Sequence, residues 1–312
     1  MKKYSKVLSL ALAFVMLFAL CACGAAETPA AEPTAVPAAD APASEAPAET
    51  EAPAESQGVL DQIKADGVLY VTLSPDFAPM EFVDSSKDGQ EQYVGFDVTL
   101  AKYIAEYIGV DLVIEPMSFD ACQTAVYTGS VPMSISGYSW TEERGENYEI
   151  SDYYYAGDNE TEQVILIKKT DADKYTSAED FSGVDVGAQN ASLQMNLLTS
   201  QLPDANPITI GDLGVGVLEL QNGSIEALAV AKGNAEMILD SNPDLMICPW
   251  EFEVAAEYEA NVILITKGET ALLNVVNEAL AKAYADGLYG TWYEDAVALA
   301  KSENAAEVSV ED

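Results

Sequence analysis

Segments with the pattern of β-strands alternate along this chain with segments of helical periodicity. Val68–Leu73 is a β-rich apolar run, and Asp97–Ile108 carries apolar residues on one helical face, with Gly109 as its expected end. Further strands are expected at 112–114 and 133–135, with a helix capped by Asp120 and reaching 128–129 between them. Strands that alternate with helices favour βαβ units around a parallel sheet, so the expected fold class is α/β.

The same alternation restarts after Asp158. It predicts strands at 164–167, 184–186, 227–230 and 262–265, and helices near 192–200, 214–221 and 270–286. Each half has about 100 residues, which is the size of a single domain. In open sheets of this kind, ligands bind beyond the carboxyl ends of the strands. A binding site is therefore expected in the cleft between the halves.

The charge of the chain excludes one class of partner and several kinds of chemistry. It has 52 acidic residues, 14 basic residues and no histidine, for a net charge of −38. A nucleic-acid-binding protein needs a basic face to contact phosphates, so nucleic acid is excluded. Catalysis by Ser-His-Asp or Cys-His sites and histidine-dependent metal sites are excluded as well. The acidic residues follow no calcium-loop spacing, and we expect no metal or other cofactor.

The N-terminus has the form of a secretory signal. Three lysines precede the apolar run 7–20, which is shorter than the ~20 residues of a transmembrane helix. The sequence 20–23 resembles a bacterial lipobox, which predicts a signal peptide at 1–22 and a lipid on Cys23. The alternatives are that Cys21 carries the lipid or that the signal is a plain secretory one.

Residues 23–57 contain mostly Ala, Pro, Glu, Thr and Ser and no aromatic residue. Such a segment has nothing to bury, so we expect a disordered linker between the lipid and the folded body. An acidic tail is expected at 303–312. The body retains Cys122 and Cys248; export permits a disulfide between them, but their expected placement on different halves argues against it.

Six motifs, taken in order and spacing, point to one family. They are Gly67–Phe82, Val94–Asp97, Met117–Asp120, Ile135–Arg144, Ile150–Tyr154 and Ala285–Trp292. Together they resemble the extracytoplasmic solute-binding proteins, family 3, of polar amino acid ABC transporters. The resemblance covers nearly all of residues 58–302.

The resemblance implies a two-lobed fold of the periplasmic-binding-protein-like type II, a venus-flytrap that closes on its ligand by hinge motion. Lobe 1 would comprise 58–160 plus 262–302, and lobe 2 would comprise 161–261. The implied function is a monomeric, lipid-anchored receptor outside the cell membrane, which delivers an amino acid or related small carboxylate to ABC permease subunits. The alternatives are an enzyme of the same fold, such as a dehydratase, and a sensory protein without a transport role.

Arg144 is the sole arginine of the chain and matches the family residue that grips the ligand's α-carboxylate. A guanidinium offers a planar fork that matches two carboxylate oxygens, which lysine cannot reproduce. The alternative is a surface arginine paired with the adjacent glutamates. Ser136, Gly137 and Ser139 match positions that supply hydroxyl and backbone donors, or they are ordinary turn residues at the end of a strand.

Phe77 and Phe119 match two aromatic residues that sandwich the ligand's side chain, although phenylalanine is more often a core residue. In the second lobe, Asn190 and Ser192 match a loop that caps the same carboxylate at a helix N-terminus. Either of them could instead be only the N-cap of that helix.

The sequence departs from the family pattern at residues 231–232. The family normally places there an aspartate that pairs with the ligand's α-amino group, whereas this chain has Ala231 and Lys232. Either another carboxylate replaces that aspartate, or the ligand is not a free α-amino acid. If Lys232 faces the cleft, it favours a ligand with a second anionic group; the alternative is that it points to solvent. The candidate carboxylates are Asp76, Glu81 and Glu236.

Overall fold

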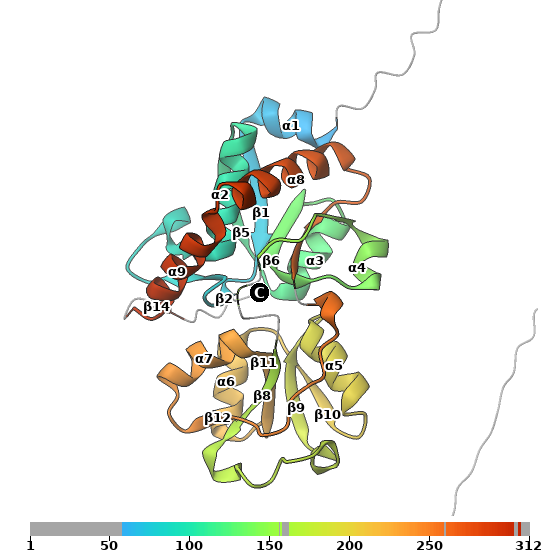
Figure 1. The fold of residues 1–312 in the computed structure, drawn as a ribbon, viewed down its shortest axis with the longest axis vertical. Helices are drawn as coiled ribbons and strands as arrows, with labels where there is room; N and C mark the ends of the chain where they lie inside the picture. Colours follow the sequence, from blue (N-terminus) through green and yellow to red (C-terminus); the bar gives the residue numbers. More distant parts are fainter. Residues whose placement is uncertain (1–57, 156, 158–161, 259, 303–304, 307–312) are drawn as a thin grey trace, which may run out of the picture. The chain divides into compact units, whose positions relative to one another are not determined.

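Two five-stranded sheets, each with helices packed around it, form the body of the protein (Figure 1). The computed structural model describes residues 58–155, 157, 162–258, 260–302 and 305–306. The predicted signal peptide (1–22), the lipidated Cys23, the linker to residue 57 and most of the acidic tail lie outside the described residues. Those expectations therefore stay predictions.

The first sheet has the strand order β5-β1-β6-β13-β7. Its strands are β1 (Val68–Leu73), β5 (Asp111–Pro116), β6 (Met133–Ser139), β7 (Glu149–Ile150) and β13 (Asn261–Ile265). The helices that accompany it are α1 (Val59–Asp66), α2 (Phe96–Ile108), α3 (Phe119–Tyr127), α4 (Glu142–Asn147), α8 (Thr270–Ala285) and α9 (Leu288–Ala300). We call these elements the first lobe.

The second sheet has the strand order β10-β9-β11-β8-β12. Its strands are β8 (Gln163–Lys168), β9 (Asp185–Gln189), β10 (Asn206–Ile210), β11 (Ala227–Ala231) and β12 (Leu245–Ile247). The helices α5 (Leu193–Gln201), α6 (Leu213–Asn222) and α7 (Lys232–Ser241) belong to it, and we call these elements the second lobe. Short 3₁₀ helices are η1 (Gly89–Gln92), η2 (Lys169–Asp171), η3 (Ala178–Phe181) and η4 (Ala256–Tyr258).

The α/β class is confirmed, but the expectation of parallel sheets is wrong in part. β1 runs parallel to β5 and β6, and β9 runs parallel to β10 and β11. β13 and β8 run antiparallel to their neighbours. A parallel neighbour needs a crossover connection, usually a helix, that returns the chain to the end of the sheet where the previous strand began. The chain instead enters β8 and β13 directly from the other lobe. Both sheets are therefore mixed.

A small third sheet forms in addition to the strands that the sequence predicts. It contains β2 (Asp76–Phe77), β3 (Glu81–Asp84), β4 (Tyr93–Val94) and β14 (Ala305–Ala306), with β3 paired to all the others. The hairpin β2–β3 pairs Asp76 with Phe82. Asp76 and Phe77 therefore lie on a paired strand.

Most helix boundaries agree with the expectations to within one or two residues. α2 ends at Ile108, and Gly109 follows in the left-handed conformation with a φ of 88°, as a helix terminator should. Asp120 is not the N-cap of α3, because Ser118 occupies that position. Asp120 lies in the first turn of the helix and accepts a hydrogen bond from Ser118 Oγ at 2.8 Å.

The apolar side chains form cores on both faces of each sheet. In the first lobe a large core joins the sheet to α2 and α8, and a smaller one lies on the side of α3. In the second lobe one core includes α5 residues and the other includes α6 and α7 residues. Polar residues lie at the carboxyl ends of two inner strands: β6 ends at Ser139 and β9 ends at Gln189. Within the described part of the chain, no helix is both long and apolar enough to cross a membrane.

Candidate ligand-binding site

A pocket lies among residues that both lobes contribute. Its first-lobe residues come from the hairpin, from the start of α3, from the end of β6 and from α4, and its second-lobe residues come from the end of β9 and the start of α5. The lining residues are Phe77, Phe119, Ser136, Gly137, Ser139, Arg144, Gln189, Ser192, Leu193 and Gln194.

Seven of the nine predicted ligand-binding residues line this pocket; Asn190 and Lys232 do not. Gln189, Leu193 and Gln194 line it as well, although they were not predicted from the sequence. A signal for them was present, because all three lie within or directly after the segment 189–192 that resembles the family's second-lobe loop. The ligand-binding role of each residue remains a prediction.

Arg144 is enclosed rather than spread on the surface, with 5% of its surface exposed. Its Nη1 donates a hydrogen bond to the carbonyl of Ser139 at 2.5 Å, and its Nη2 donates to the carbonyl of Ala191 in the second lobe at 3.0 Å. Its Nε donates to Gln123 Oε1 at 3.3 Å. The planar guanidinium is thus held in one orientation at the pocket wall.

Two aromatic rings flank the guanidinium of Arg144. Its Cζ lies 5.1 Å from the ring centroid of Tyr138 and 5.8 Å from that of Phe119, which is within the range of cation–π attraction. The two rings are 4.9 Å apart. Phe77 and Phe119 each pack against a core and also line the pocket, and their contact with a ligand stays a prediction.

Helix α4, which carries Arg144, is fastened at both ends. Thr141 is its N-cap, with Oγ1 accepting a hydrogen bond from the backbone N–H of Arg144 at 3.1 Å.

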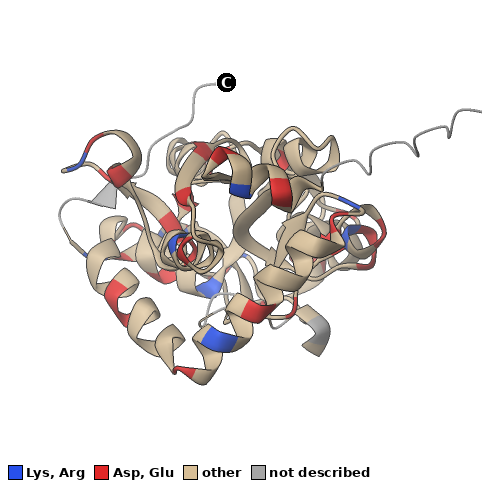
Figure 2. Cartoon of the chain, turned by 90° about the horizontal axis from the view of Figure 1, so that it is seen from above, with Lys and Arg blue, Asp and Glu red and all other residues tan. Residues whose placement is uncertain are grey.

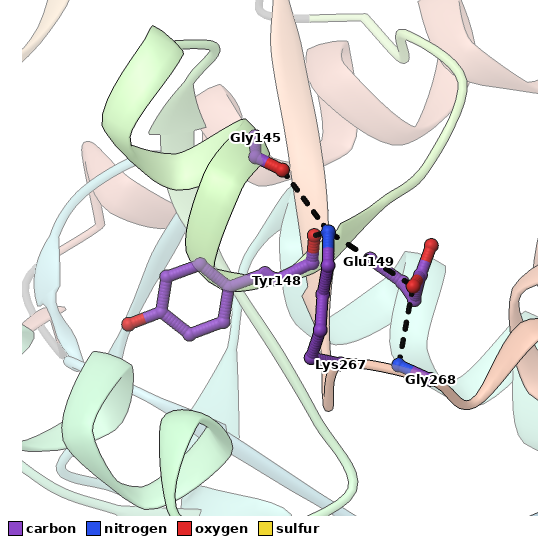
Figure 3. A network of polar contacts seen from close by, with 5 residues as sticks. All are labelled: Gly145, Tyr148, Glu149, Lys267 and Gly268. Carbon is purple, nitrogen blue, oxygen red and sulfur yellow. Dashed lines mark hydrogen bonds and ion pairs between the residues drawn. The ribbon is translucent and has the colours of Figure 1, made fainter.

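Lys267 holds the carboxyl end of α4 (Figure 3). Its Nζ donates hydrogen bonds to the carbonyls of Gly145 at 3.1 Å and Tyr148 at 2.9 Å, and lies 4.0 Å from Glu149 Oε1. The same Oε1 accepts from the backbone N–H of Gly268 at 3.1 Å. A cation at this end satisfies carbonyls that have no partner within the helix. Arg144 therefore lies on a short helix whose two ends are held by hydrogen bonds with Thr141 and Lys267.

The donors of Ser136 and Gly137 point to buried carboxylates. Ser136 Oγ donates to Glu81 Oε1 at 2.6 Å and accepts from the backbone N–H of Ser74 at 3.0 Å. The backbone N–H of Gly137 donates to Asp97 Oδ2 at 2.8 Å. These two donors were expected to serve the ligand, whereas the structure engages both with carboxyl groups behind the pocket.

Glu81 and Asp97 share a buried hydrogen bond with each other, and burial raises the pKa of both carboxyl groups. The pKa of Asp97 rises to about 7, and that of Glu81 rises well above its usual range because the nearby Asp97 charge adds to the effect of burial. Asp97 Oδ2 also accepts a hydrogen bond from Tyr154 Oη at 2.9 Å, which favours the charged form of Asp97 and opposes the effect of burial. Within the described residues, no group of three or more acidic or cysteine side chains is arranged to hold a metal ion.

Asp76, the third buried acid, connects the lobes. Its Oδ2 accepts hydrogen bonds from Gln189 Nε2 at 2.8 Å and from the backbone N–H of Leu213 at 2.9 Å, and both donors belong to the second lobe. Burial raises its pKa to about 7. The negative charge of Asp212, which caps α6, contributes to that rise.

In the second-lobe loop, Ser192 is the N-cap of α5 and also lines the pocket; its Oγ accepts from the backbone N–H of Met195 at 3.1 Å. Asn190 lies beside the pocket lining and donates through Nδ2 to Asp120 Oδ2 at 2.9 Å, which is a contact between lobes. The structure therefore gives Asn190 a bridging position and gives Ser192 the capping position.

Lys232 stands outside the pocket lining, at the start of α7. Its ammonium pairs with Glu162, and that hydrogen bond raises the pKa of the lysine. Ala231 is fully buried. Of the two positions that the sequence leaves open for Lys232, the structure shows the one away from the pocket lining, in a peripheral ion pair with Glu162. The case for a second anionic group on the ligand therefore loses its support.

The model of the bacterial extracellular solute-binding proteins, family 3, matches residues 69–296 of this chain. The chain belongs to this family. The match spans both lobes, nearly all of the six motifs quoted from the sequence and every residue of the pocket lining.

Among curated relatives, a probable histidine-binding protein of Campylobacter jejuni is 26% identical over 223 residues, covering 72% of this chain and 82% of the relative. The crystal structure of the amino acid ABC transporter substrate-binding protein AbpA of Streptococcus pneumoniae, bound to L-arginine, superimposes with a TM-score of 0.71. It is 31% identical and covers 78% of this chain and 100% of AbpA.

The ancestral amino acid-binding protein AncCDT-1, described as a precursor of cyclohexadienyl dehydratase, superimposes with a TM-score of 0.65. It is 30% identical and covers 76% of this chain and 98% of that protein. The family, the two-lobed type II fold and the similarity to amino acid receptors of ABC transporters, all expected from the sequence motifs, are thus confirmed.

Proposed function

We propose that this protein is the lipid-anchored receptor of a bacterial ABC importer, which captures an amino acid outside the cell membrane and delivers it to the permease. The family match and the amino acid-binding relatives support the receptor role. The export signal and the lipobox-like sequence ending at Cys23 support the anchor.

One observation carries the proposal: the sole arginine of the chain is buried at the wall of a pocket between two α/β lobes. A guanidinium in this position can exchange its carbonyl partners for the two oxygens of a ligand's α-carboxylate. Because the lining of the same pocket includes Gln189 and Ser192 of the second lobe, a carboxylate bound to Arg144 would lie among residues of both lobes. Such a ligand favours the closed arrangement, which is the state a permease can recognise.

The chemistry of the pocket lining points to a ligand with a single carboxylate. Arg144 is the only charged residue among those that line the pocket, and the others are aromatic, aliphatic, hydroxyl or amide residues. Phe77 and Phe119 offer flat faces for a side chain. We therefore place amino acids ahead of dicarboxylates as ligands.

Thermal-shift screening tests this proposal against L-arginine, L-histidine, L-glutamine and L-cystine, with succinate as a dicarboxylate control. A true ligand at 100 times its dissociation constant stabilises the folded state by about 2.7 kcal/mol, a shift of several degrees for a body of this size. We expect at least one of the amino acids to shift the midpoint and succinate not to. A shift by succinate alone would contradict the proposed ligand class.

Arg144→Ala should weaken binding of that amino acid by roughly tenfold to 100-fold, since a hydrogen-bonded charge partner is worth about 1.5–3 kcal/mol. Isothermal titration calorimetry measures the effect. Lys174→Ala is the matched control, because it removes an exposed cation of the second lobe that lies outside the pocket lining. Equal affinity of Arg144→Ala and the parent protein would overturn the assignment of Arg144.

Turnover of the ligand by a dehydratase-like enzyme is the second candidate. The similarity to AncCDT-1 and the raised pKa of the buried acids favour it. Against it, Asp76, Glu81 and Asp97 all stand behind the pocket lining, and they reach it only through Gln189, Ser136 and Gly137. Mass spectrometry of the bound ligand after prolonged incubation separates the two functions, because a receptor returns it unchanged.

The lipid anchor is tested by labelling cells with radioactive palmitate. We expect the label on the parent protein and on Cys21→Ser, and none on Cys23→Ser, because the cleavage before the second cysteine leaves it at the N-terminus. Label retained by Cys23→Ser and lost from Cys21→Ser would move the anchor to the first cysteine.

A further inference from the structure

Gln189 is a pocket residue whose hydrogen-bond partner lies in the opposite lobe. It is the last residue of β9, and 7% of its surface is exposed. Its Nε2 donates to Asp76 Oδ2 at 2.8 Å across the boundary between the lobes. The amide of this pocket residue is therefore oriented by a residue that does not itself line the pocket.

Asp76 can act only as an acceptor when it is ionised, so it draws the NH₂ group of Gln189 toward itself. Its carboxylate is fixed for that task by two further donors. Leu213 N–H, at the start of α6, donates to Oδ2 at 2.9 Å, and Ser74 Oγ donates to Oδ1 at 2.8 Å. The carboxylate is nearly enclosed, with 5% of the residue exposed.

The other end of the Gln189 amide is left open. Among the described residues, no donor is directed at Gln189 Oε1, and this oxygen is not one of the fully enclosed polar atoms. Since Gln189 lines the pocket and its NH₂ group is committed to Asp76, the carbonyl oxygen is the polar atom that the side chain can offer to a ligand.

We propose that Asp76 is a positioning residue, which turns the amide of Gln189 so that Oε1 accepts a hydrogen bond from an N–H group of the ligand. The inference rests on the proposed receptor function and gives the ligand a further property, an N–H donor in addition to its carboxylate. It also supplies a second-lobe acceptor in a chain that has the buried Ala231 where the family has an aspartate.

The arrangement reverses when Asp76 takes up a proton. A protonated carboxyl group donates, so it favours the flipped amide, with Oε1 toward Asp76 and NH₂ toward the pocket. The titratable groups that face Asp76 are Asp212 at the start of α6, Glu81 on β3 and the buried thiol of Cys122 on α3. Burial raises the pKa of Asp76 to about 7, with Asp212 adding to the rise, so the reversal falls near neutral pH.

Nuclear magnetic resonance of the ¹⁵N-labelled protein tests the arrangement directly. The side-chain amide signal of Gln189, assigned by its loss in Gln189→Glu, is followed from about pH 5.5 to about pH 8.5, a window that brackets the raised pKa. We expect a titration with a midpoint of about 7 in the parent protein and none in this range in Asp76→Asn. A Gln189 signal that does not titrate, or that titrates alike in both proteins, would overturn the proposal.

Asp212→Asn provides a control that does not depend on the folding of Asp76→Asn. Asparagine caps helices as well as aspartate does, so α6 keeps its N-cap. Removing the negative charge of Asp212 should move the midpoint of the Gln189 titration to lower pH. An unmoved midpoint would contradict the assignment of that titration to Asp76.

Calorimetry with L-arginine and L-glutamine, at about pH 8.0 and about pH 5.5, tests the consequence for binding. For the amino acid that binds, we expect the parent protein to lose about tenfold in affinity at the lower pH. Asp76→Asn should change by less than about twofold between the two pH values. Equal pH dependence in both proteins would overturn the role of Asp76. Failure of every amino acid to bind the parent would instead overturn the proposed function, while the amide titration still decides the positioning role.

Discussion

Ala191 adopts a backbone conformation that residues other than glycine rarely hold. Its φ is 56°, and it lies in the second-lobe loop beside the pocket. Its carbonyl accepts hydrogen bonds from Arg144 Nη2 at 3.0 Å and from Gln123 Nε2 at 3.4 Å. Ala191 is the one described non-glycine residue with a positive φ. Both first-lobe side chains therefore bond to a residue whose backbone is strained.

Substitutions at Ala191 should reveal this strain. Ala191→Val should lower the free energy of unfolding by about 1–2 kcal/mol, because a β-branched residue tolerates positive φ worse than alanine does. Ala191→Gly removes the strain and should be as stable as the parent or more so. Urea unfolding curves measure both changes. A valine variant as stable as the glycine variant would show that the loop can relax at no cost.

The residues of the site differ in how far the sequence could predict them. Arg144, Ser136 and Phe119 belong to motifs with fixed spacing, so their order along the chain was enough to bring them together. The buried bonds of Asp76 and Glu81 could not be predicted, because the sequence does not show which of 52 acidic side chains are enclosed. The orientation of Lys232 stayed open because its partner Glu162 is 70 positions away in the chain.

At the scale of elements, α4 is the short helix that carries Arg144, the one charged residue of the pocket lining. It has only 6 residues, too few to be stable by itself, and Thr141 and Lys267 secure its two ends. Lys267 belongs to the segment between β13 and α8. The C-terminal part of the first lobe thus holds the short helix that carries Arg144.

Lys267→Met should loosen α4. We expect it to lower the free energy of unfolding by about 1–2 kcal/mol, through loss of the bonds to the helix end, and to speed hydrogen exchange in α4. Lys282→Met is the matched control, since Lys282 pairs with Asp286 on exposed helix surface, where solvent screens the attraction and little stability is lost with it. Equal losses of unfolding free energy in the two variants, or unchanged hydrogen exchange in α4, would contradict the role of Lys267 in holding this helix.

Elements with strong local signals could be predicted, and those decided by distant partners could not. The strand Val68–Leu73 and the helix that begins at Thr270 follow from their own apolar patterns. The directions of β8 and β13 depend on the path of the chain between the lobes, which no local pattern encodes. The hairpin β2–β3 was missed because strands of 2 and 4 residues are too short to show alternation.

At the scale of the whole molecule, the protein combines an acidic surface with acidic groups inside. Acidic residues are spread over the described elements, and basic residues are few (Figure 2). Asp76, Glu81 and Asp97 are buried, and for each of them burial is the main reason for the raised pKa. The folded state therefore holds protons that the unfolded chain would release.

Stability should rise as the pH falls from about 8 to about 5.5. An acid with a raised pKa contributes stability that is fully present below its unfolded pKa and is lost as the pH rises through its folded pKa, here about 7 for Asp76 and Asp97. Acids with lowered pKa, such as Asp84 and Asp180, act only below this window. We expect a rise of at least about 2 °C in the midpoint of thermal unfolding.

A pair of variants separates the effect of buried acids on stability from the effect of net charge. Asp97→Asn and Asp173→Asn change the charge equally, but only the first removes a buried acid; Asp173 is exposed. The pH dependence should flatten in Asp97→Asn and persist in Asp173→Asn. The reverse result would assign the effect to repulsion among surface charges.

The guanidinium of Arg144 already has the carbonyls of Ser139 and Ala191 as partners, so the capture of a carboxylate that we propose would be an exchange of partners rather than a simple gain. A carboxylate brings a full negative charge and two oxygens that match the guanidinium fork, whereas each carbonyl is neutral and accepts one bond, so a carboxylate would win the exchange. An ester or amide of the same compound brings only another neutral oxygen and gains nothing. On the proposed function, the internal carbonyls would thus set a threshold that lets one arginine distinguish a free acid from its ester or amide.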